Sequence, residues 1–235
     1  LLIFSLSFLI PIFQLIYWSF ATYQVVLNQK TWQLLMNSVY VALIATCFII
    51  FASVVIANYD RISENHISKF FSKLVSLGYS IPGAVIAIGV MVLFIKLEQK
   101  LYWIYQIANP DTGKLVLSMS LAMLICAYII RFLAIGFNSV QTGFEKIGEK
   151  YFEASRTLGM TTTITFFRVD LPLLKPALVG GFFLVFVDIL KELPLTLILR
   201  PFNFATLATR VYRYASDEMI PETAVPSLII ITVSL

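Results

Sequence analysis

Five long apolar segments constrain this chain more than any other feature of its sequence. Each carries few or no charged residues and is close to the ~20 residues that cross a hydrocarbon core. Backbone polar groups inside a bilayer must be satisfied within the segment, so each is expected to be an α-helix. The segments are residues 1–20, 33–57, 74–95, 115–137 and 176–199, and a sixth begins near Pro226. The predicted fold class is therefore all-α, a polytopic transmembrane helical bundle of about six spans.

The composition supports the same class. Hydrophobic residues make up 59% of the 235 residues and charged residues only 13%, more apolar surface than a soluble domain can bury. The net charge of +4 is small, and we expect a lipid bilayer and no nucleic acid as partner.

Both ends of the sequence lie in apolar runs. Leu1 has no preceding initiator Met, and Leu235 ends a sixth segment that would make only about 15 Å of helix. We expect residues 1–235 to form a single transmembrane unit of a longer polypeptide.

The polar loop between the fourth and fifth segments, about residues 138–175, is organised like an amphipathic helix. Ile147, Tyr151, Ala154 and Leu158 are spaced by four, three and four residues, which places them on one helical face. The other face takes the charged residues Lys146, Glu149, Lys150, Glu153 and Arg156.

A turn and a second helix are predicted to follow. Gly159 suits a left-handed C-terminal cap, and Thr161 to Thr163 offer hydroxyls that can cap a helix from about Ile164 to Val169. The loop is therefore predicted to be a helix, a glycine corner and another helix. A generic helix lying on the membrane surface is the alternative.

The loop resembles a signature of the permease subunits of binding-protein-dependent ABC importers of type I. That signature runs Glu-Ala-Ala, three residues, Gly, nine residues, Ile, one residue, Leu-Pro. Here Glu153-Ala154-Ser155, Gly159 and Val169-Asp170-Leu171-Pro172 have the same spacing, with Ser155 and Val169 as departures. The resemblance implies a helix that couples to a cytoplasmic ATPase through Ile147, Tyr151, Glu153, Ala154, Ser155, Leu158 and Gly159.

A second stretch is similar to the second half of fused iron(III) permeases. Lys191-Glu192-Leu193-Pro194 is followed by Arg200-Pro201-Phe202, as in that group. The resemblance implies import of ferric iron delivered by a periplasmic binding protein. Permeases for phosphonate, polyamine or sulfate share the loop and are the alternatives within the family. An ion-coupled secondary transporter or a membrane enzyme is the alternative hypothesis outside the family.

The resemblance also implies the partners and the compartment. They are a cytoplasmic ABC ATPase dimer, a periplasmic substrate-binding protein and a second permease unit, either a fused first half or a second copy. The expected location is the bacterial inner membrane. The sequence lacks a phosphate-binding loop, a zinc motif and a nucleophile elbow. We therefore expect no catalytic residue, metal or cofactor on this chain, with ATP and Mg on the partner subunit.

The distribution of basic residues predicts which loops of the chain face the cytoplasm. Loops 58–73 and 138–175 carry several Lys and Arg and should share the cytoplasmic side, which leaves segments 21–32, 96–114 and 200–225 external. Arg200, Arg210 and Arg213 then either contact an acidic lobe of the binding protein or lie on a solvated surface.

Two further places are candidates for a pathway or gate. Pro82 and Gly83 are expected to kink the third span, either as a fixed bend or as a gate. Charges at membrane depth are costly, so Asp188, Lys191 and Glu192, with Pro194 beside them, are expected either to line the pathway or to form a structural ion pair. Helical spacing predicts Asp188 and Glu192 on one face.

Overall fold

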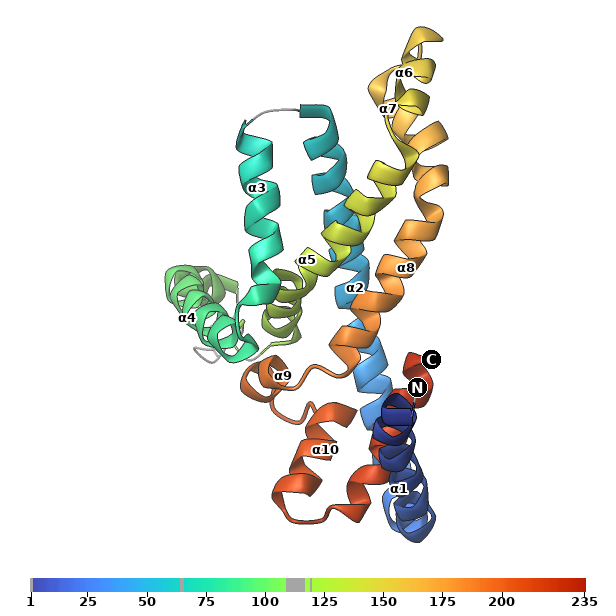
Figure 1. Cartoon of the computed structure of the whole chain (residues 1–235). Helices are drawn as coiled ribbons and strands as arrows, with labels where there is room; N and C mark the ends of the chain where they lie inside the picture. Colours follow the sequence, from blue (N-terminus) through green and yellow to red (C-terminus); the bar gives the residue numbers. More distant parts are fainter. Residues whose placement is uncertain (1, 64–65, 109–116, 119) are drawn as a thin grey trace. The chain divides into compact units, whose positions relative to one another are not determined.

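The computed structural model describes residues 2–63, 66–108, 117–118 and 120–235 (Figure 1). Every regular element in these residues is a helix, which confirms the predicted all-α class. The elements are α1 (Leu2–Val26), α2 (Gln29–Ser63), α3 (His66–Leu77), η1 (Gly78–Ser80), α4 (Gly83–Ala108), α5 (Leu121–Ile147), α6 (Lys150–Thr157), α7 (Thr162–Thr165), the π-helix η2 (Phe166–Asp170), α8 (Leu171–Leu190), α9 (Pro194–Leu199), α10 (Leu207–Ser216), η3 (Pro221–Thr223) and α11 (Ala224–Ser234).

Four helical stretches in the described part of the chain are long and apolar enough to cross a membrane. They are Ser5–Val26, Gln29–Ser63, Leu121–Ile147 and Thr162–Leu190, and the pair α3 and α4 makes a fifth if it counts as one broken span. These stretches correspond to the first, second, fourth and fifth predicted segments, so the polytopic prediction holds.

The third predicted span is not one kinked helix. Regular structure stops at Ser80, Ile81 is extended with φ −84° and ψ 131°, and α4 starts at Gly83. A proline disfavours the helical conformation of the residue before it, and Pro82 therefore separates two helices here. The kink predicted at Pro82 and Gly83 is therefore a complete break in the helix.

The fifth predicted span also differs. The helix α8 starts at Leu171, before the apolar run, and ends at Leu190, so residues 191–193 lie between it and the short helix α9. Pro194 is the first residue of α9, where its missing N–H costs no hydrogen bond.

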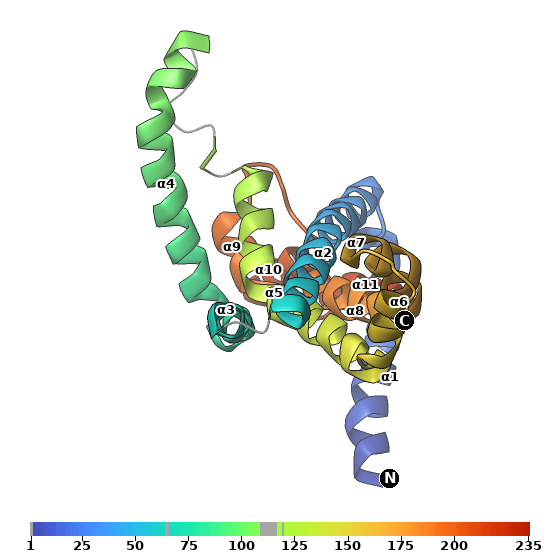
Figure 2. The same cartoon turned by 90° about the horizontal axis from the view of Figure 1, so that it is seen from above.

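The chain forms two compact units, of which the second comprises residues 44–86 and 126–189. In it the second half of α2 lies beside α5 and α8 (Figure 2). A buried apolar cluster joins these helices and contains Ala57, Phe137, Val140, Phe144 and Leu174. Two glycines of α5 allow close packing: a Cβ on Gly136 would lie 2.6 Å from the Ser53 Oγ, and one on Gly143 would lie 2.6 Å from the Ala177 Cβ.

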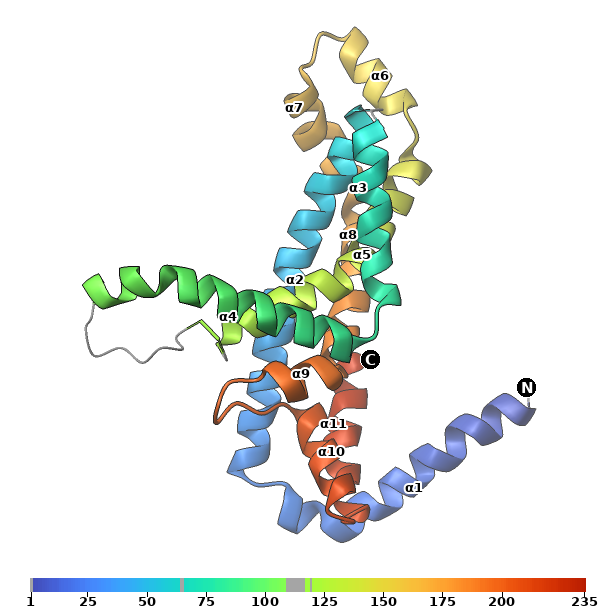
Figure 3. The same cartoon turned by 90° about the vertical axis from the view of Figure 1, so that its left-hand side faces the viewer.

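The first unit comprises residues 1–43, 87–125 and 190–235. In it α1, α10 and η3 pack on α11, and Figure 3 shows α10 beside α11. The Leu207 N–H donates to the Ser38 Oγ at 2.8 Å, and Asn37 donates to the Ala205 carbonyl at 3.2 Å. The Thr22 hydroxyl donates to the Pro221 carbonyl at 3.4 Å, so segments 21–32 and 200–225 meet, which agrees with the prediction that they share one side.

Candidate coupling loop and basic cavity

The first loop helix, α6, is shorter than predicted. It begins at Lys150, whereas Ile147 is the last residue of α5, and Gly148 between them has φ +70°. The left-handed conformation at Gly148 ends α5. Ile147 therefore does not share a helical face with Tyr151, and that part of the prediction is wrong.

The glycine corner forms as predicted. Gly159 has φ +80°, its N–H donates to the Arg156 carbonyl at 3.0 Å, and the Met160 N–H donates to the Ser155 carbonyl at 3.1 Å. These two bonds are the Schellman pattern, which satisfies the last carbonyls of a helix. The Thr161 hydroxyl then accepts from the Ile164 N–H at 3.4 Å and caps α7.

The inner side of the loop is polar and buried. Ser155, at the third position of the signature, is only 4% exposed. Its hydroxyl donates to the Phe152 carbonyl at 2.7 Å and lies 2.9 Å from the Thr165 hydroxyl. Ser155 thus joins α6 to α7 from within the loop. It does not belong to the exposed surface that the resemblance implies for docking.

The outer side of the loop carries exposed apolar side chains. Leu158 is 79% exposed and Tyr151 is 56% exposed, and Ala154 and Glu153 beside them are also exposed. Large apolar side chains this exposed, on a short helix whose C-terminus is capped, form a surface on which a partner can bury area.

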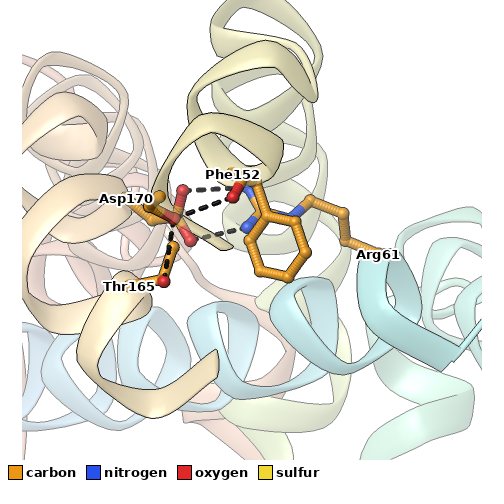
Figure 4. Close-up of polar contacts among 5 residues, drawn as sticks. Arg61, Phe152, Thr165 and Asp170 are labelled. Carbon is orange, nitrogen blue, oxygen red and sulfur yellow. Dashed lines mark hydrogen bonds and ion pairs between the residues drawn. The ribbon is translucent and has the colours of Figure 1, made fainter. Parts of the chain in front are cut away.

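A buried ion pair lies beneath α6, and the sequence did not reveal it. The Arg61 guanidinium, at the end of α2, donates to both carboxylate oxygens of Asp170 at 3.2 and 2.5 Å (Figure 4). The Asp170 side chain is 1% exposed and that of Arg61 is 14% exposed. The guanidinium also lies 4.5 Å from the ring centre of Phe144 and 4.9 Å from that of Phe152.

This ion pair also shows where the two basic segments lie relative to each other. Arg61 lies in the basic segment 58–73, at the end of α2, and Asp170 lies in the segment 138–175, at the end of η2. Their contact puts the two basic segments on the same side of the second unit, as predicted. The available sequence signal was an arginine at the end of an apolar segment and an aspartate at the variable position before Leu171-Pro172. Neither position alone indicates the other.

The predicted charged turn is split by the end of α8. Asp188 is half-buried within α8, whereas Lys191 is exposed after that helix ends. The Glu192 carboxylate is buried and accepts from the Leu195 N–H at 3.1 Å, in the first turn of α9. Because α8 stops at Leu190, the predicted helical face shared by Asp188 and Glu192 does not exist. Glu192 instead fixes the start of α9.

The other gate candidates lie at the break before α4. Pro82 is exposed and Gly83 is buried as the first residue of α4. Their role in a gate, like that of Asp188, Lys191, Glu192 and Pro194 in a pathway, stays a prediction.

The predicted external arginines line one cavity in the first unit. It has a volume of about 410 Å³ and is lined by Arg200, Arg210 and Arg213 together with Lys30, which the sequence had not singled out. Arg210 stacks on the Tyr214 ring at 4.4 Å and donates to its hydroxyl at 2.9 Å. The concentration of positive charge suits an acidic ligand or an acidic protein surface.

The described residues contain no group of three or more His, Cys, Asp or Glu side chains arranged to hold a metal ion.

Residues 50–235 match the profile of a protein family described as "Binding-protein-dependent transport system inner membrane component". The chain is similar to the Fe(3+)-transport system permease protein FbpB 2 of Haemophilus influenzae, with 23% identity over 66% of this chain and 27% of that protein. It is also similar to PhnV of Salmonella paratyphi A, named for 2-aminoethylphosphonate transport, with 22% identity over 89% of this chain and 73% of that one.

Among solved structures, the chain has the fold of a bacterial ABC transporter involved in the import of the acidic polysaccharide alginate. The TM-score is 0.80 at 15% identity, over 99% of this chain and 87% of that one. The chain spans only about a quarter of the length of the ferric relative.

Proposed function

This chain belongs to the family of binding-protein-dependent transport system inner membrane components, the permease subunits of ABC importers, and we propose that α6 docks it onto a cytoplasmic ABC ATPase. The observation that carries the proposal is the exposed face of Tyr151, Ala154 and Leu158 on a helix that its own loop holds in place. An apolar helix face set in a partner's groove is a common recognition mode.

The proposed mechanism is mechanical. ATP and Mg bind and react on the ATPase dimer, which closes and displaces α6, while this chain contributes no cofactor and no catalytic group. The loop passes the displacement to α5 and α8, the spans on either side of it, and these rock to alternate access across the inner membrane. A second permease unit, fused or separate, completes the pathway.

Ferric ion is the first candidate substrate, because of the similarity to ferric permeases such as FbpB of Actinobacillus pleuropneumoniae, at 30% identity over 43% of this chain and 15% of that protein. A phosphonate is the second candidate, and the basic cavity favours it, since four cationic side chains repel a bare Fe³⁺. For a ferric importer, Arg200, Arg210 and Arg213 would instead contact an acidic lobe of the periplasmic binding protein.

The docking proposal is tested with Leu158→Ser in the assembled transporter. Burying a leucine is worth about 1.5–3 kcal/mol, so the affinity for the ATPase should fall by about 10- to 100-fold while the helical content is unchanged. Phe202→Ser is a matched control, because Phe202 is 82% exposed on the external segment. Normal ATPase binding by the Leu158→Ser transporter would contradict the proposal.

The substrate is tested separately by uptake into proteoliposomes that contain the complete transporter. Ferric ion and 2-aminoethylphosphonate are supplied with their respective binding proteins. ATP-dependent uptake of ferric ion alone supports the first candidate, and uptake of the phosphonate alone replaces it with the second.

A further inference from the structure

We propose that Arg61 is a positioning residue for coupling: its ion pair with Asp170 holds α6 to α2 and carries the displacement of α6 into that span. The proposal rests on the function proposed above. It adds α2, which is distant from the signature in sequence, to the elements that the ATPase moves.

The contacts of Arg61 place it at a junction. Its guanidinium binds Asp170 at the end of η2, faces the Phe152 ring of α6 and faces the Phe144 ring of α5. Arg61 itself belongs to α2, so one side chain connects four elements. Figure 4 shows its contacts with Asp170 and Phe152. A planar guanidinium suits this position because it can bind a carboxylate with two hydrogen bonds and stack on aromatic rings at the same time.

The burial of the pair makes the connection stiff. Removing either partner would leave a charge in a site that water barely reaches, which costs far more than breaking an exposed pair. The two side chains should therefore stay together while the surrounding helices move, so that a shift of η2 pulls on the end of α2.

The loop above the pair is tied together by a hydrogen bond and by continuous helix. The contact between the Ser155 and Thr165 hydroxyls at 2.9 Å ties α6 to α7, and α7 continues directly into η2, which ends at Asp170. A force on the exposed face of α6 is thus delivered to Asp170, the residue that Arg61 holds.

The backbone of the signature places Asp170 at this point. Residues Phe166–Asp170 form a π-helix, and Pro172 in the first turn of α8 has no N–H to donate to the preceding turn. Turns of π-helix are frequent at functional sites, since the wider turn changes the direction of the side chains. Asp170 is buried here, whereas Arg168, two residues earlier, is exposed.

Most of the core of the second unit packs without the pair. Phe137, Val140 and Leu174 make apolar contacts between α5 and α8, and of the buried cluster only Phe144 also faces Arg61. The buried pair lies instead at the base of α6, where its loss should loosen the loop before it unfolds the spans.

The test compares Arg61→Gln with Arg168→Gln as the exposed-arginine control. In the purified full chain, hydrogen exchange of the α6 amides should speed up by tenfold or more in Arg61→Gln, with no change within α8. In the complete transporter the ATPase should remain bound, and the substrate imported per ATP hydrolysed should fall by tenfold or more. Arg61→Lys should be intermediate, since it keeps the charge without the two-point contact.

A double variant, Arg61→Gln with Asp170→Asn, guards against simple unfolding. Replacing both charges leaves no isolated buried ion, so the chain should fold, yet coupling should still be lost. The proposal would be overturned if the folded double variant kept the parental rate of hydrogen exchange in α6 and imported as much substrate per ATP hydrolysed as the parent. The docking proposal fails by a different result, unchanged ATPase binding in Leu158→Ser, so the two failures are distinguishable.

Discussion

Replacing Gly159 by valine tests the corner of the coupling loop through backbone geometry alone. Gly159 has φ +80°, and a Cβ placed there would meet no atom within 4 Å. No steric clash with a neighbour therefore contributes. The cost comes from forcing an L-residue into the left-handed region, about 1–2 kcal/mol, with a β-branched residue at the upper end.

That cost sets the expected size of the effect. At 1.4 kcal/mol per factor of ten, the equilibrium constant for forming the corner falls by about 5- to 30-fold. If the ATPase binds only the formed corner, its affinity for the transporter should fall by up to the same factor. Membrane insertion and the melting temperature of the spans should stay unchanged, because the corner lies outside their core.

Two variants serve as controls in a binding titration of the ATPase against the reconstituted transporter. Gly180 in α8 also has open space around its Cβ position, but it lies within a helix, so Gly180→Ala should bind like the parent. Gly159→Asn should recover most of the affinity, since asparagine tolerates the left-handed conformation better than other residues. Parental affinity in Gly159→Val would refute the argument that this corner positions α6.

Two further changes test the structure away from the corner. Gly143→Val should lower the free energy of unfolding by about 1–3 kcal/mol, because the new Cβ would lie 2.6 Å from the Ala177 Cβ. An unchanged melting temperature would show that α5 and α8 pack less closely at this point than the structure has them. Glu192→Ala should cost about 1.5–3 kcal/mol by removing the carboxylate that accepts from Leu195, whereas Glu192→Gln should retain much of that stability; equal melting temperatures for the two would argue against the capping role.

The parts of the loop that the sequence predicted are those with local causes. A glycine after a short amphipathic stretch and a threonine before the next helix determine their own backbone geometry, and both behave as expected at Gly159 and Thr161. The membrane segments were also predictable, since the length and hydrophobicity of a span are properties of consecutive residues.

The errors come from tertiary or competing local effects. The hydrophobic spacing predicted a loop helix that begins at Ile147. In the structure Ile147 is the last residue of α5, and Gly148 separates it from α6. The kink expected at Pro82 and Gly83 is a complete break between two helices, and the fifth apolar run gave no sign that α8 ends as early as Leu190. The contact between Arg61 and Asp170 joins residues 109 positions apart, and no periodicity within either segment encodes such a pair.

The structure gives a physical reason for the spacing of the signature. Ser155 must reach Thr165 across the corner, which sets the distance from α6 through Gly159 to α7. Asp170 must then end η2 beneath α6, directly before the Leu171-Pro172 pair that starts α8. Inserting one residue within the helix that starts at Thr162 would rotate the side chains after it by about 100° relative to those before it, at 3.6 residues per turn. Such an insertion would turn Asp170 away from Arg61 and leave the exposed face of α6 intact. The spacing of the signature therefore reflects the attachment of the loop to its own spans as well as the shape of the docking surface.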